Sequence, residues 1–334
     1  MDQTTIPERK PGFLSGKRGR RIKAAITGYT FLLPATIVLI AFHFYPVFYA
    51  FYISLHKWRI VKQSYVGFAN YSRALHDPDF WQALVNTVYY VIGTVPFQLV
   101  FALIVAYLLY QDIKGREAYR VSYFLPYITS TIASGAVFAW IFNPNHGPVN
   151  QLLKALGLKP LQWLLEPKGI FDLIARAHGW KSVPIHGPSL AMVTIFLFVI
   201  WFWLGYDATL FLAGLGNIPK ELYEAAEIDG ANKWQLFRYI TVPLLSPTTF
   251  FLTIVAVIGS FKAFNHIFIM NDASSVEIGG PLGTTMTVAI LIYKKFYEVP
   301  TYGYASAISF LLFFIILAFT LLQNYAGSKH VHYG

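Results

Sequence analysis

Six long apolar segments dominate this sequence. Each is long enough to cross a bilayer, because a transmembrane helix needs roughly 20 mostly apolar residues. The chain is 56% hydrophobic and only 13% charged, whereas a soluble domain is about a quarter charged. Its surface is therefore too apolar for water to be the main solvent. We predict an all-α integral membrane protein with six transmembrane helices, over residues 25–55, 84–110, 119–142, 188–214, 248–270 and 303–325.

Basic residues cluster ahead of the first apolar segment and predict its orientation. Cytoplasmic flanks of membrane helices carry an excess of Lys and Arg, so the leader is placed in the cytoplasm, and six crossings return the C-terminus there. We predict a basic cytoplasmic tail over 1–24, a membrane domain over 25–325 and a cytoplasmic tail over 326–334. The first segment is too long for a signal peptide, and no small-residue cleavage site follows it. The basic residues of the leader are Arg9, Lys10, Lys17, Arg18, Arg20, Arg21 and Lys23.

The net charge of +10 and the absence of cysteine exclude several classes of function. The basic residues lie at membrane flanks, so anionic lipid headgroups explain the charge better than nucleic acid does. Without cysteine the chain has no disulfide, no thiol nucleophile and no cysteine ligand for a metal. We predict no metal site and no catalytic residues.

The loop over 215–247 carries the strongest local pattern. Pro219 suits the first turn of a helix, where its missing N–H would be unpaired in any case. Gly230 can adopt the left-handed conformation that ends a helix, and a second amphipathic run follows it. We predict a helix–Gly–helix elbow on the cytoplasmic face. Physics alone leaves two interpretations open: a docking site for a partner, which the small Ala side chains would allow to approach closely, or an amphipathic connector lying on the membrane.

One run in this loop resembles the EAA motif of bacterial ABC importer permeases. The glutamate and paired alanines of the motif are followed at fixed spacing by a glycine, an isoleucine and a proline. Val242 departs from the pattern, since many relatives have leucine there, and the change is conservative. The matching residues are Glu224, Ala225, Ala226, Asp229, Gly230, Ala231, Phe237, Ile240, Pro243, Leu244 and Leu245.

Three further stretches resemble the carbohydrate-uptake branch of that family, which includes maltose and glycerol-phosphate permeases. They are Val66–Tyr71, Gly279-Gly280-Pro281 with the following Thr284-Thr285, and Gly303–Ala307. Together with the elbow and the spans, the resemblance covers residues 29–325. It implies the fold of a type I ABC importer permease in a bacterial-type inner membrane, and it implies import of a sugar, an oligosaccharide or a sugar-like solute.

The resemblance also implies partners and a coupling mechanism. In the family the elbow is a coupling helix that docks on a cytoplasmic ATPase subunit, and closure of two ATPase subunits switches the pore between its two openings. The expected partners are two ATPase subunits, a second and dissimilar permease, an extracytoplasmic solute-binding protein and membrane lipid. ATP and Mg would be used by the ATPase, with no cofactor bound by this chain. The residues expected to couple are Glu224, Ala225, Ala226, Asp229, Gly230, Ala231 and Pro243.

Polar and aromatic side chains in two spans are candidates for the solute pathway. The fourth span holds Trp203, Tyr206 and Asp207, which share one helical face by their i, i+3, i+4 spacing. The fifth span holds Ser260, Lys262, Phe264 and Asn265. Aromatic faces and paired donors and acceptors are what sugars require, although aromatic residues in a membrane also pack or face lipid. The resemblance places Trp203, Tyr206, Ser260 and Ala263 at solute-facing positions, and the main solute site could instead lie in the second permease.

Asp207 and Lys262 are ionisable groups within predicted spans, where charge is costly and usually faces a cavity or an opposite charge. Our hypothesis is that both face the pore and form a pair. The alternative is that one of them lies near a helix end and extends its charge to the interface.

Two other classes of function are less compatible with the sequence. A membrane-embedded enzyme needs clustered catalytic groups, and the nine histidines are scattered. The run Gly12–Lys17 is one residue short of a phosphate-binding loop, so another chain is expected to hydrolyse ATP. A channel or ion-coupled transporter commonly has repeated halves and broken helices, and neither is evident in the sequence.

Overall fold

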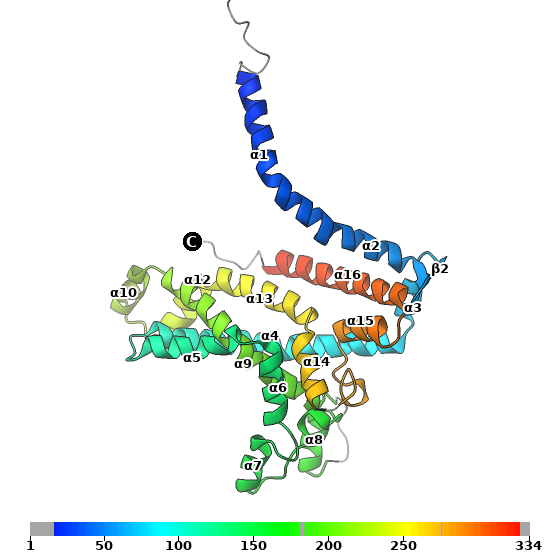
Figure 1. Ribbon diagram of the computed structural model, residues 1–334. Coiled ribbons are helices and arrows are strands. Elements are labelled where there is room, and N and C mark those ends of the chain that lie inside the picture. The colour runs from blue at the N-terminus through cyan, green and yellow to red at the C-terminus, as the bar shows by residue number, and fades with distance from the viewer. Residues whose placement is uncertain (1–16, 181–183, 185, 275, 328–334) are drawn as a thin grey trace, which may run out of the picture.

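The computed structural model describes residues 17–180, 184, 186–274 and 276–327, and helices make up most of them (Figure 1). Four helices in this part are long and apolar enough to cross a membrane: Gly19–Ser54, Pro78–Tyr110, Leu190–Gly216 and Tyr302–Gly327. Two bent helix pairs raise the number to six if each pair counts as one span. The fold is therefore the predicted all-α membrane architecture.

The first half of the chain ends in a loop that contains short helices. Its elements are α1 (Lys17–Leu39), a π-helical turn (Ile40–Phe44), α2 (Tyr45–Ser54), β1 (His56–Trp58), β2 (Lys62–Tyr65), α3 (Ala69–Leu75), α4 (Pro78–Tyr110), α5 (Arg116–Ile128), α6 (Thr131–Ile141), α7 (Pro148–Ala155), a 3₁₀ turn (Trp163–Leu165) and α8 (Ile170–Ala177).

The second half contains the elbow and the remaining spans. Its elements are α9 (Leu190–Gly216), α10 (Lys220–Ile228), α11 (Lys233–Leu236), a π-helical turn (Phe237–Thr241), α12 (Val242–Leu244), α13 (Ser246–Phe261), α14 (Asn265–Ala273), a 3₁₀ turn (Pro281–Gly283), α15 (Val288–Tyr297) and α16 (Tyr302–Gly327).

The first helix stands apart from the rest of the molecule. α1 diverges from the bundle, whereas α2 runs alongside α16 (Figure 1). Side chains from Arg20 to Leu39 are exposed. Helix α1 begins at Lys17, inside the segment predicted as a tail. The rest of that tail, residues 1–16, and the end of the C-terminal tail, 328–334, lie outside the described residues.

Helix α4 forms the centre of the bundle and packs against α9, α13 and α15. Its alanines Ala83, Ala102 and Ala106 are fully buried, and such small residues let membrane helices approach closely. Gly205 lets α9 and α5 approach closely, because a Cβ at this position would lie 2.0 Å from the backbone oxygen of Tyr123.

Two of the predicted spans are broken, and the expectation of continuous helices over 119–142 and 248–270 was wrong. Helices α5 and α6 meet at 98°, where Thr129 is extended and Ser130 caps α6 with its side chain. Helix α13 stops at Phe261, and α14 starts at Asn265 after Phe264 leaves the helical conformation. The structure therefore contains broken helices. Their absence, inferred from the sequence, no longer counts against an ion-coupled transporter.

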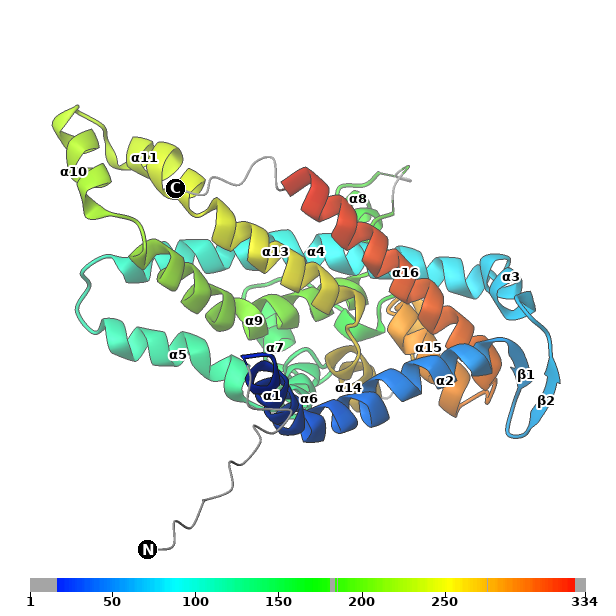
Figure 2. The same cartoon turned by 90° about the horizontal axis from the view of Figure 1, so that it is seen from above.

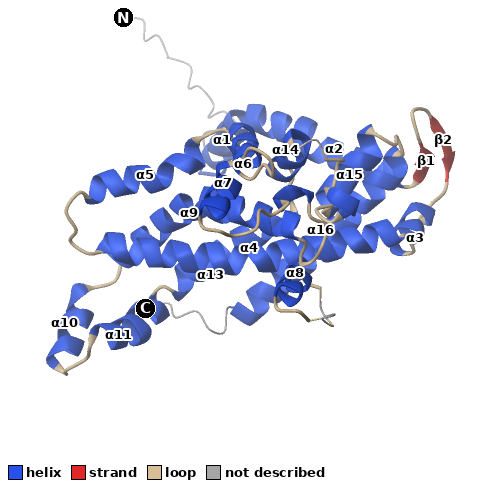
Figure 3. Ribbon diagram, turned by 90° about the horizontal axis from the view of Figure 1, so that it is seen from below, coloured by secondary structure: helices blue, strands red, loops and turns tan. Residues whose placement is uncertain are grey.

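The three stretches that resemble carbohydrate permeases form contacts at the end of the bundle opposite the elbow (Figure 3). Asn70 Nδ2 donates to the carbonyl oxygens of Ser54 at 2.7 Å and of His56 at 3.0 Å. A Cβ at Gly303 would lie 2.0 Å from the His56 oxygen. Asn86 Nδ2 donates to Gly283 O at 2.9 Å and so holds the Gly-Gly-Pro turn against α4. These residues therefore join loops to helices.

Asn70→Ala should loosen the β1–β2 hairpin, because two carbonyl groups at the end of α2 lose their donor. Each buried group left unpaired costs about 1–3 kcal/mol. Hydrogen exchange measured by mass spectrometry should rise over residues 55–66. Asn145→Ala, at an exposed position in another loop of the same half, is the control. Equal exchange in both variants would contradict the role given to Asn70.

Candidate functional site

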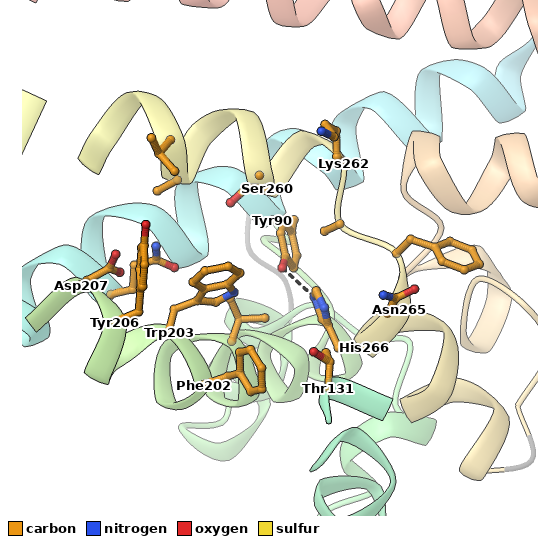
Figure 4. Close-up of a pocket in the computed structure, with 17 residues that line it drawn as sticks. Tyr90, Thr131, Phe202, Trp203, Tyr206, Asp207, Ser260, Lys262, Asn265 and His266 are labelled. Carbon is orange, nitrogen blue, oxygen red and sulfur yellow. Dashed lines mark hydrogen bonds between the residues drawn. The ribbon is translucent and has the colours of Figure 1, made fainter. Parts of the chain in front are cut away.

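A cavity of about 220 Å³ lies inside the membrane domain, between α4, α9, α13 and the start of α14 (Figure 4). All seven residues predicted for the solute pathway line it, although the sequence separates them by up to 62 positions. The break after α13 makes this possible, because it turns the segment around Lys262 towards α9. The seven residues are Trp203, Tyr206, Asp207, Ser260, Lys262, Phe264 and Asn265.

Trp203 and Tyr206 form an aromatic wall together with Tyr127 of α5. Tyr206 stacks on Tyr127 with ring centroids 4.7 Å apart and planes at 29°. Trp203 meets Tyr206 edge-on at 5.7 Å. Both Trp203 and Tyr206 are half-buried, which leaves part of each ring on the cavity. This is the kind of surface on which the apolar face of a sugar ring can rest.

Asp207 and Lys262 line the same cavity, but they do not form the hypothesised ion pair, and none joins them among the described residues. Lys262 is the C-cap of α13, and its side chain is exposed. Asp207 is only 3% exposed and has Gln98 of α4 beside it. Figure 4 shows the two charged groups well apart. The early end of α13 explains the separation, because Lys262 lies at the C-cap of α13 and not within a continuous helix.

Helix α4 supplies site residues that the sequence did not reveal. Tyr90 Oη and His266 Nε2 form a hydrogen bond of 2.7 Å, and the His266 ring stacks on Phe198. Tyr90 and His266 are 1% and 8% exposed. Gln98 also lines the cavity. The sequence signal for these residues is a polar side chain within an apolar span. Which of these side chains face the cavity depends on how the helices pack against one another.

The elbow has the predicted helix–Gly–helix geometry. Gly230 has φ +84°, and its N–H donates to Glu227 O at 3.0 Å while the Ala231 N–H donates to Ala226 O at 2.9 Å. These two bonds form the Schellman arrangement that ends helices at a left-handed glycine. Asn232 and Gln235 then bond each other's backbone N–H groups as a capping box that starts α11.

Part of the elbow is anchored to the membrane domain, and part is free. Tyr223 Oη lies 3.0 Å from Thr241 Oγ1, and burial raises the pKa of the Tyr223 hydroxyl, which therefore stays neutral. Phe237 meets Tyr107 of α4 edge-on at 5.0 Å. Glu224, Ala225, Asp229 and Gly230 are exposed, whereas Ala226, Ala231 and Pro243 are half-buried. Figure 2 shows α10 and α11 projecting beyond the ends of the spans.

Large apolar side chains are exposed on the same projection. Their exposed fractions are 44% for Leu222, 86% for Ile228, 68% for Trp234 and 72% for Tyr239. Exposed apolar surface marks contacts with a protein or with the membrane. The elbow therefore presents a contact surface that fits both interpretations, the docking site and the connector lying on the membrane.

Tyr90→Phe should destabilise the membrane domain, because it removes the hydrogen-bond partner of a buried histidine nitrogen. The cost should be about 1–3 kcal/mol, seen as a lower midpoint of thermal unfolding for the purified protein in detergent. Tyr65→Phe, at an exposed tyrosine of the outer hairpin, is the matched control and should leave the midpoint unchanged. An unchanged midpoint in Tyr90→Phe would show that the bond adds nothing.

Comparison with known proteins identifies relatives along nearly the whole chain. The lactose transport system permease protein of Rhizobium radiobacter is 32% identical over 308 residues, which are 91% of this chain and 95% of that protein. The trehalose/maltose transport system permease protein of Thermococcus litoralis is 32% identical over 309 residues, 92% of this chain and 95% of the relative.

Solved structures show the same fold. A crystal structure of a bacterial ABC transporter involved in the import of the acidic polysaccharide alginate matches with a TM-score of 0.77, 21% identity, and coverage of 94% of this chain and 99% of that chain. A second structure, of a bacterial alginate ABC transporter with an alginate pentasaccharide-bound periplasmic protein, matches with a TM-score of 0.75 and 21% identity, over 94% of this chain and 98% of that one.

A family model described as the binding-protein-dependent transport system inner membrane component matches residues 66–329. That span covers most of the chain, and the relatives exceed 30% identity over about nine-tenths of it. The resemblance to the permease family is confirmed. This chain therefore belongs to the family of binding-protein-dependent inner-membrane transport components, the permease subunits of ABC importers.

Proposed function

We propose that this chain forms half of the translocation pathway of an ATP-driven importer for a sugar or oligosaccharide. The observation that carries the proposal is the cavity inside the membrane domain, where aromatic faces and hydrogen-bonding groups from α4, α9, α13 and α14 meet. Such a wall offers stacking to a pyranose ring and partners to its hydroxyl groups. The relatives named as lactose and trehalose/maltose permeases support the same class of solute.

The cavity of about 220 Å³ is smaller than sites for drug-sized ligands, which are about 300–1,000 Å³. We propose that a second, dissimilar permease completes the wall. Helix α1 would contribute to that contact, because its apolar surface lies away from this chain's own bundle. Lipid would cover what the second permease leaves exposed.

The elbow would transmit movement from the ATPase. Its exposed Glu224 and Asp229 offer carboxylates to basic or backbone donors of a partner, and Ile228 offers apolar surface. Two cytoplasmic ATPase subunits would bind ATP and Mg, and this chain would bind no cofactor itself. The elbow end and both termini would then lie in the cytoplasm, and the hairpin end would face an extracytoplasmic solute-binding protein. The neighbour solved in complex with a periplasmic protein supports a partner of this kind.

Trp203→Ala should reduce solute passage, because it removes an aromatic face of the cavity. Loss of one stacking surface is expected to lower the maximal uptake rate about tenfold, by analogy with the roughly 0.5–1.5 kcal/mol of an aromatic pair plus its buried area. The assay is ATP-dependent uptake of labelled lactose, trehalose or maltose into proteoliposomes that hold the whole complex and its binding protein.

Trp201→Ala is the matched control for this experiment, since Trp201 lies on the same helix but packs on Phe138 outside the cavity. Uptake that falls equally in the two variants would assign the loss to helix packing. Uptake of none of these sugars by the wild-type complex, with ATP hydrolysis intact, would contradict the sugar proposal.

Gly230→Pro should uncouple the ATPase from transport. Proline can neither adopt φ +84° nor donate the N–H that bonds Glu227, so α10 and α11 would change their relative direction. ATP hydrolysis stimulated by the loaded binding protein should fall at least tenfold, on the scale of the roughly 3 kcal/mol that a misplaced proline costs.

Gly157→Pro provides the control. Gly157 ends α7 with φ +75° and a bond from its N–H to Lys154 O, so it has the same local geometry at the opposite side of the protein. Its variant should retain stimulated hydrolysis. Equal stimulated ATP hydrolysis in Gly230→Pro and Gly157→Pro would show that the elbow does not couple the ATPase to transport.

A further inference from the structure

Asp207 is the acidic residue among those that line the cavity, and very little of it reaches water. It lies in the middle of α9, only 3% of its surface is exposed, and its Oδ2 atom has no hydrogen-bond partner among the described residues. Gln98 approaches the carboxyl group from α4. A buried polar atom without a partner is rare in native proteins and calls for an explanation.

No described cation forms an ion pair with Asp207. The described acidic groups that have ion pairs are Glu117, Asp172 and Asp79. The cation that shares the cavity, Lys262, is exposed and lies apart from Asp207 (Figure 4). Gln98 lies beside the carboxyl group, and Oδ2 is the atom left without a donor. The α9 end of the cavity therefore holds a buried acid with no cation beside it.

The neighbouring side chains indicate what could supply the missing donor. Trp203 and Tyr206 place aromatic surface next to Asp207 (Figure 4). A ligand that rests on this surface and donates one hydrogen bond to a carboxylate is a polyhydroxylated ring. A ligand with its own carboxylate would place a second acid beside Asp207 with no cation between them, and two adjacent carboxyl groups cannot both ionise without cost.

We propose that Asp207 determines the charge class of the solute: the pathway takes neutral, hydroxyl-rich glycosides, one hydroxyl of which donates to Asp207, and it disfavours uronates. This inference rests on the proposed function. It separates this permease from a transporter of acidic polysaccharides, although the fold is shared with one. Asp207 would be a specificity-determining residue in contact with solute rather than a partner of Lys262.

The test compares maximal uptake rates in proteoliposomes that contain the complete complex, with maltose and lactose as neutral probes and a digalacturonate as the acidic probe. Each sugar is supplied at a concentration that fully loads the binding protein, so that the maximal rate reports passage through the membrane and the apparent KM reports delivery. The wild type should carry a neutral probe at least tenfold faster than the uronate.

Two variants at position 207 separate charge from hydrogen bonding. Asp207→Leu should lower the maximal rate for the neutral probe about tenfold or more, since hydrogen bonds to charged groups are among the stronger ones, and leave the apparent KM in place. Asp207→Asn, which keeps an acceptor, should recover part of that rate and narrow the preference against the uronate. Asp272→Asn removes an exposed carboxylate of α14 outside the cavity and should change neither quantity.

Equal rates for neutral and acidic probes in the wild type, or an Asp207→Leu variant with a normal rate, would overturn the inference while leaving the importer proposal intact. A wild-type complex that hydrolyses ATP and carries none of the probes would instead overturn the proposed function.

Discussion

The structure depends on one constraint of the lipid bilayer: every backbone N–H and C=O within it needs a partner, because no water is available. Continuous helices meet this requirement by themselves. A helix can be broken at membrane depth only where the freed groups line a cavity or are buried in protein. The break after Phe261 meets this condition, because residues 262–265 between α13 and α14 line the cavity. The break after Ile128 leaves Thr129 and Ser130 exposed on this chain, and Thr131 beyond it lines the cavity.

The cavity and the elbow lie on the same helices, which gives the molecule a path for coupling. Helix α9 carries Trp203, Tyr206 and Asp207 and leads directly into α10. The chain returns from the elbow through α11 and α12 into α13, which carries Ser260. Tyr223 and Thr241 join the two limbs by a hydrogen bond of 3.0 Å. A displacement of the elbow would therefore be passed to both sides of the cavity by rigid helices.

The sequence predicts some features of this molecule well because they depend on local properties. Apolar length reveals the spans, the spacing of Trp203, Tyr206 and Asp207 reveals a shared face, and Gly230 reveals a helix end. It does not reveal that the spans over 119–142 and 248–270 are broken, because apolar content averaged over a whole span does not register a break inside it. The pairing of Asp207 with Lys262 was wrong for that reason. Tyr90 and Gln98 depend on how α4 packs, which no local pattern encodes.

The central claim is that this permease works as half of a pathway driven by a separate ATPase. Purification of the chain from native membranes in mild detergent, with every bound subunit identified by mass spectrometry, tests it most directly. The account predicts that an ATPase subunit and a second, dissimilar permease accompany the chain. A chain that purifies alone, or only with copies of itself, from membranes that retain sugar uptake would contradict the account.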